Sequence, residues 1–91
     1  MGELTRLDDV VATKKCENCI EIQIKDEIDL EDATIKILGK DRNLLVKIPN
    51  PQHKTEVCLY TGSPMFVEIT NHFGSVVKYV EGSGDEYYNQ N

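Results

Sequence analysis

Apolar and polar residues alternate along most of this chain, and the alternation is clearest in its first third. Ile20, Ile22 and Ile24 fall on one side of the pattern, and polar residues fall between them. A period of two is typical of a β-strand with one buried face. The same parity continues to Leu30, although Asp26 falls on the apolar side and indicates a bend or bulge.

The rest of the chain predicts a series of short strands separated by turn-forming residues. Gly39–Asn43 is rich in turn formers and predicts a hairpin between its two flanking strands, and Pro49 and Pro51 end the second of them. The connections are too short for crossover helices, so we expect an antiparallel meander. The fold class is mainly β: a small five- or six-stranded barrel or sandwich. The strands are predicted over residues 19–24, 33–38, 44–48, 55–61, 65–70 and 76–80.

The N-terminal residues have a different spacing. Leu4, Leu7 and Val11 recur at helical intervals, and Val10 widens the stripe. We therefore predict a short amphipathic helix or lead-in over residues 1–15, an antiparallel β domain over 16–82, and a flexible acidic tail over 83–91.

Length and composition favour one soluble domain. The 91 residues are 40% hydrophobic, which suits a single aliphatic core. No apolar run is long enough for a membrane span or a signal peptide. Three cysteines, an odd number, fit reduced thiols better than a disulfide framework, and we expect the cytoplasm.

The charge is acidic and unevenly distributed. A formal net charge of −6 argues against direct binding to nucleic acid, which draws on clustered Lys and Arg. One short run carries five carboxylates but lacks the glycine that a common calcium loop needs. It predicts either a solvated strand face that discourages edge pairing or a docking surface for a basic partner. These residues are Asp26, Glu27, Asp29, Glu31 and Asp32.

The cysteines and histidines offer a candidate metal site. Cys16 and Cys19 are spaced as two zinc ligands on a tight turn, and Cys58 with His53 would complete a Cys3His set if their loop folded beside that turn. His72 is the other available ligand. A redox pair, favoured by the neighbouring lysines, and plain unligated thiols are the alternatives.

No catalytic machinery is evident in the sequence. His53 and His72 fall in predicted loops and have neither a nucleophile motif nor a glycine-rich phosphate cradle beside them. We therefore expect no enzyme activity.

The strand succession from residue 33 onward is similar to a known module. Ala33–Leu38, Leu44–Pro49, Val57–Gly62, Met65–Thr70 and Gly74–Tyr79, with the strand-ending proline and the glycine-centred turns, resemble the N-terminal β-barrel of flagellar-brake proteins. In that family the barrel precedes a PilZ domain that binds cyclic di-GMP. The arginine-rich and Asp/Asn-x-Ser-x-x-Gly signatures of PilZ are absent here, and we expect no second domain after Val80. The resemblance implies a non-catalytic regulatory or interaction barrel, and it carries over no nucleotide-binding residue.

Three functional hypotheses follow. The first is a regulatory or protein-interaction module that acts through a protein partner or as a homodimer paired along a strand edge such as Ile20–Ile24. The second is an acidic, phage-type or regulatory inhibitor that imitates nucleic acid and occupies a basic groove on a nucleic-acid-binding protein. The third is a small domain stabilised by zinc.

Overall fold

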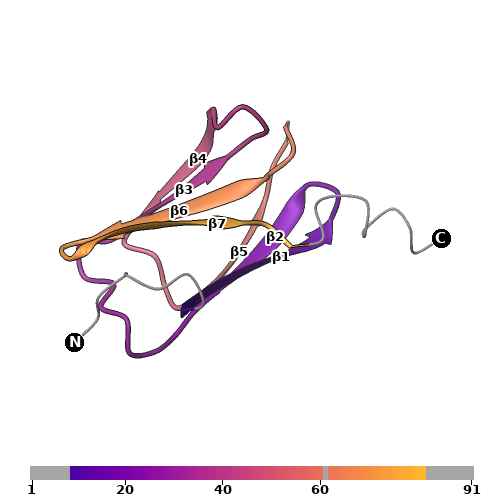
Figure 1. The fold of residues 1–91 in the computed structure, drawn as a ribbon. Coiled ribbons are helices and arrows are strands. Elements are labelled where there is room, and N and C mark those ends of the chain that lie inside the picture. The colour runs from indigo at the N-terminus through magenta and orange to yellow at the C-terminus, as the bar shows by residue number, and fades with distance from the viewer. Residues whose placement is uncertain (1–8, 61, 82–91) are drawn as a thin grey trace.

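A computed structural model describes residues 9–60 and 62–81 of the chain, and in this part the protein is an antiparallel β-sandwich (Figure 1). The prediction of a mainly β fold is confirmed. There are seven strands in these residues: β1 (Val10–Cys16), β2 (Cys19–Ile24), β3 (Thr34–Leu38), β4 (Leu44–Pro49), β5 (Lys54–Cys58), β6 (Phe66–Asn71) and β7 (Gly74–Tyr79).

The strands form two sheets, one in the order β1-β2-β5 and the other in the order β4-β3-β6-β7. The predicted hairpin of β3 and β4 is confirmed. The predicted meander is wrong, because β5 returns to pair with β2 and β6 returns to pair with β3. The sandwich alternative is confirmed and no closed barrel is formed.

The core is aliphatic, as expected, and lies between the two sheets. Most of its fully buried side chains come from alternate positions of four strands, because successive residues of a strand face opposite sides. They include Ile20 and Ile22 of β2, Ile35 and Ile37 of β3, and Val67 and Ile69 of β6, together with Val10 and Ala12 of β1.

The predicted N-terminal helix is wrong over residues 10–15, which belong to β1. Val10, Ala12 and Lys14 face the interior, and the residues between them are more exposed. The inward lysine hides the alternation in the sequence: its Nζ donates a hydrogen bond to Ser63 Oγ at 2.8 Å, which lets a charged residue occupy a core position. The β-branched valines favour a strand here. The earlier part of the predicted helix and the predicted tail lie outside the described residues.

β2 ends at Ile24, close to the break predicted near Asp26, and residues 25–33 form a loop that carries the chain to the other sheet. Two backbone bonds close turns within the loop, from Ile28 N to Lys25 O at 3.0 Å and from Ala33 N to Leu30 O at 3.1 Å. Ile28 is buried in the core even so. Burial of this side chain explains why the alternation of apolar and polar residues continues beyond Ile24 in the sequence.

The two lateral sides of the sandwich differ. On one side Lys14 N donates to Glu81 O at 2.9 Å and Glu81 N donates to Ala12 O at 2.8 Å, so the chain after β7 closes against β1. On the other side, β4 and β5 are the outermost strands of their sheets, and no strand of the described chain pairs with their outer edges. No helix in these residues is long and apolar enough to cross a membrane.

Candidate functional site

The open side of the sandwich, between β4 and β5, exposes part of the apolar interior. Leu45, Val46 and Ile48 of β4 and Val57 of β5 pack against the core but remain partly accessible. In a closed sandwich such side chains would be covered by a neighbouring strand. Here they line a surface that we call the open groove.

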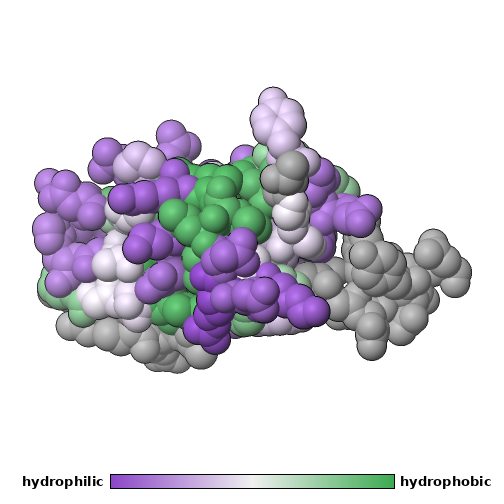
Figure 2. Space-filling model, turned by 90° about the horizontal axis from the view of Figure 1, so that it is seen from above, coloured by the Kyte–Doolittle hydropathy of each residue, from purple (hydrophilic) through white to green (hydrophobic). Residues whose placement is uncertain are grey.

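Two adjoining hollows make up the open groove, and both include Leu45. One, of about 350 Å³, lies between Leu45 and Val46 on one side and the residues Val57–Tyr60 on the other. The second, of about 320 Å³, extends from Leu45 to Gly62, Ser63 and Met65. Figure 2, seen from above, shows a hydrophobic patch in the middle of this face with hydrophilic side chains on either side of it.

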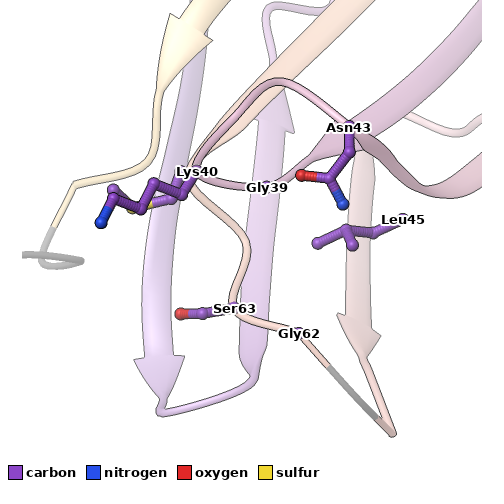
Figure 3. Close-up of a pocket in the computed structure, with 7 residues that line it drawn as sticks. Gly39, Lys40, Asn43, Leu45, Gly62 and Ser63 are labelled. Atoms are coloured by element: carbon purple, nitrogen blue, oxygen red, sulfur yellow. The ribbon is translucent and has the colours of Figure 1, made fainter.

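The second hollow depends on local features of two turns. Figure 3 shows Leu45 and Asn43 on the β4 side and Gly62 with Ser63 on the opposite side. Gly62 has a φ of +83°, and a Cβ at this position would lie 3.1 Å from Leu45 Cδ2. A side chain at residue 62 would therefore be strained and would enter the hollow. The hydrogen bond from buried Lys14 to Ser63 anchors this segment from the core side.

Tyr60 lines the first hollow of the open groove and is fully exposed, with a relative accessibility of 103%. The neighbouring Leu59 is buried at 7%. An exposed aromatic ring beside an apolar groove is the kind of residue that carries binding energy in protein interfaces. Sequence reasoning placed Tyr60 within a strand and gave it no role.

The three cysteines lie in one row across the sheet β1-β2-β5. Cys16 is opposite Cys19, and Cys19 is opposite Cys58. Cys19 and Cys58 form a disulfide with Cα atoms 4.0 Å apart, and Cys16 is a free thiol. The expectation of three reduced thiols is therefore wrong for two of them. The pairing depends on the register of strands 39 residues apart, which the sequence pattern does not reveal.

The four residues proposed as zinc ligands do not share a site in this structure. Cys19 and Cys58 are bonded to each other, and His53 lies near the opposite end of β2, where its backbone carbonyl accepts from Ile24 N at 2.8 Å. Its Nε2–H donates to the carbonyl of Ile28 at 3.0 Å. No cluster of three or more metal-binding side chains occurs in residues 9–60 and 62–81. His72 lies beside Asp32 instead, with its Nε2 3.6 Å from Asp32 Oδ2.

The five carboxylates predicted to bind a partner all lie in or at the end of the 25–33 loop rather than on a strand face. Asp26, Glu27, Glu31 and Asp32 are exposed. Asp29 is partly buried, and its Oδ1 accepts from the backbone N of Glu31 at 2.9 Å, which stabilises the turn. The loop thus presents several acids to solvent but not at the even spacing of a strand.

A charged cluster occupies the outer face of the sheet β1-β2-β5. Glu21 lies between Lys15 and Lys54, with Nζ–Oε distances of 3.1 Å and 3.2 Å. Hydrogen bonds from these two ammonium groups lower the pKa of Glu21 from its ordinary value of 4.5, and the bond from Lys15 has the larger effect. The cluster joins all three strands of the sheet near the cysteine row.

A scan of protein-family models and searches of the curated proteins and of the solved structures find no match to this chain. The resemblance to the flagellar-brake barrel therefore stays a prediction.

Proposed function

We propose that this protein is a non-catalytic interaction module whose open groove receives an extended segment of a protein partner. The observation that supports it most is the combination of two outer strands, β4 and β5, with partly exposed core side chains between them. Backbone N–H and C=O groups on such edges can pair with an added strand. The hollows beside Leu45 and Val57 would take alternate side chains of that strand.

The shape of the groove favours a polypeptide over a compact ligand. Two hollows that share Leu45 lie side by side at the start of β4, one lined in part by Tyr60 and the other by Lys40. An extended segment presents side chains to one face at every second residue, which matches two adjacent hollows. Burial of each leucine-sized side chain contributes about 1.5–3 kcal/mol, so two or three anchors would supply about 3–9 kcal/mol, and pairing of the backbone with a strand edge would add to this.

A second apolar strip is exposed elsewhere on the protein, but it is less suited than the open groove to receive a partner. Leu44, Phe66 and Tyr79 lie in one row across the sheet β4-β3-β6-β7 and are partly exposed. Arg42 stacks over the Phe66 ring at 4.6 Å, and Tyr79 packs edge-on against it at 5.6 Å. The two rings already contact each other, and β6, which carries Phe66, is paired with a strand on both sides.

The acidic alternative is supported by the 25–33 loop. Its exposed carboxylates, Asp26, Glu27, Glu31 and Asp32, would suit a basic protein surface. Such a contact is governed by charge and weakens steeply with salt, whereas strand addition at the open groove does not.

We propose the cytoplasm as the compartment, where the Cys19–Cys58 bond would form only transiently.

Site-directed photo-cross-linking tests the proposal. The photoreactive residue p-benzoylphenylalanine replaces Tyr60 in one variant and Phe73, an exposed residue of the β6–β7 turn, in the control. Irradiation in the native host should give a discrete adduct at position 60 that disappears when Leu45→Thr is also present. An adduct with the mass of two chains would identify the partner as a second copy. Equal adduct yields at both positions, or an adduct at position 60 whose yield is unchanged by Leu45→Thr, would contradict the proposal.

A further inference from the structure

The row of cysteines places a free thiol next to a disulfide on the outer face of one sheet. Residues opposite each other in antiparallel strands point to the same face, and a register shift between Lys14 and Cys16 changes the parity of β1 so that Cys16 lies opposite Cys19. Cys16, Cys19 and Cys58 therefore share the outer face of the sheet. Cys16 and Cys19 are partly buried, and Cys58, on the outermost strand, is exposed.

The spacing between Cys16 and Cys19 suits a bond between them as well. They flank the two-residue turn Glu17–Asn18 of the β1–β2 hairpin. Residues opposite each other in such pairs have Cα atoms about 4.5–5.5 Å apart, within the range of roughly 4.4–6.8 Å found for disulfides. Cys16 and Cys58 are separated by a whole strand, about 9–10 Å, and cannot bond directly without backbone movement.

Asn18 connects the free thiol to the far side of the disulfide. Its Oδ1 accepts from the Cys16 Sγ–H at 3.7 Å, its Nδ2 donates to Leu59 O at 2.8 Å, and its backbone O accepts from Leu59 N at 2.9 Å. These contacts hold the turn that carries Cys16 against the residue next to Cys58.

We propose that the three cysteines form a thiol–disulfide relay that delivers a nucleophilic thiolate to Cys58. The Cys16 thiol loses its proton to solvent and the thiolate attacks Cys19 Sγ. The Cys16–Cys19 bond forms as the Cys19–Cys58 bond breaks, and the electron pair leaves on Cys58. One disulfide and one thiolate are present before and after, so no external oxidant or reductant is needed. Cys19 lies between Cys16 and Cys58 in the row, so its sulfur is the nearer of the two bonded sulfurs to Cys16.

The relay moves reactivity from a partly buried position to the rim of the open groove. Cys58 contributes to the same hollow as Val57 and Tyr60. Once released, its thiolate can attack a disulfide of a docked polypeptide or a small disulfide such as oxidised glutathione, forming a mixed disulfide while the other sulfur of that bond leaves as a thiolate. The relay itself does not depend on the proposed function, because it takes place within this chain.

Peptide mapping distinguishes the two pairings cleanly. Trypsin cuts after Lys15, Lys25, Lys54 and Lys78, so residues 16–25 hold both Cys16 and Cys19, and residues 55–78 hold Cys58. A Cys19–Cys58 bond links these two peptides, whereas the relay product gives peptide 16–25 with an internal bond and peptide 55–78 with a free thiol.

The full chain, in its oxidised form, is treated at mildly alkaline pH with dilute iodoacetamide, quenched in acid and mapped. We expect alkylated Cys58 together with the internal Cys16–Cys19 bond, formed at a fractional rate independent of protein concentration. Cys16→Ser should reduce alkylation of Cys58 by about tenfold or more, since no attacking thiolate remains. Alkylation confined to Cys16 with the Cys19–Cys58 link intact would overturn the relay. A rate that rises with protein concentration would show exchange between molecules and would also overturn it.

Discussion

Replacing Cys19 with serine should destabilise the protein more than any other single cysteine change, because Cys19 is the middle member of the row. The Cys19–Cys58 bond closes a loop with a sequence separation of 39 residues. The chain-entropy relation gives about 4 kcal/mol for a cross-link of that length, which acts mainly by restricting the unfolded chain. In Cys19→Ser the two remaining thiols lie a strand apart, so no substitute bond forms without backbone movement.

The other two cysteine variants give a graded comparison. Cys16→Ser keeps the native bond and should unfold like the wild type. Cys58→Ser leaves Cys16 and Cys19 free to pair, and that four-residue loop is worth only about 2 kcal/mol in the same relation. We therefore expect an order of stability in which Cys16→Ser is highest, Cys58→Ser intermediate and Cys19→Ser lowest.

Urea unfolding of the oxidised proteins measures these differences, and a reducing agent provides the reference. A loss of about 4 kcal/mol lowers the melting temperature of a domain of this size by roughly 15–30 °C. With the bond reduced, the wild type should approach the Cys19→Ser variant. If Cys19→Ser and Cys16→Ser unfold within about 0.5 kcal/mol of each other without reductant, the disulfide does not stabilise the fold and the reasoning is refuted.

Three further predictions concern other parts of the fold. Gly62→Ala should lower the free energy of unfolding by about 1–3 kcal/mol, because residue 62 has a φ of +83° and its Cβ would press on Leu45; an unchanged urea midpoint would contradict this. Glu21→Gln should lower stability near neutral pH but not in acid. The wild-type carboxylate has a lowered pKa, so its contribution is present above the ordinary pKa of 4.5 and is lost as the pH falls through the lowered value; a difference that persists in acid would exclude this cause. Joint substitution of Asp26→Asn and Glu27→Gln should leave groove binding unchanged at physiological salt, and a large loss would favour the acidic alternative.

The strands that bury one face could be predicted from the sequence, because burial imposes a period of two. This holds for β2 and β3, whose inward residues are apolar without exception. It fails for β1, where Lys14 takes an inward position and is satisfied by Ser63, a residue 49 positions away. A hydrogen bond between residues so far apart in the sequence cannot be predicted from a local pattern.

Strand pairing and the candidate site were harder to predict for the same reason. Period two shows which face is buried but not which strand lies alongside, so the β2–β5 pairing and the disulfide that depends on its register were missed. Leu45 and Val57 resemble ordinary core residues in the sequence. Only the position of β4 and β5 at the outer edges of their sheets makes these side chains accessible.

Selection of random twelve-residue peptides against the purified protein tests the central claim most directly, because the natural partner does not have to be identified first. If the open groove receives an extended segment, selected peptides should carry apolar residues at alternate positions. Their affinity should fall about tenfold or more on Leu45→Thr or Tyr60→Ser and stay unchanged on Phe73→Ser, each tenfold step being about 1.4 kcal/mol. Failure to enrich any peptide, or binding that ignores Leu45→Thr and Tyr60→Ser alike, would contradict the claim that this side of the sandwich is a binding site.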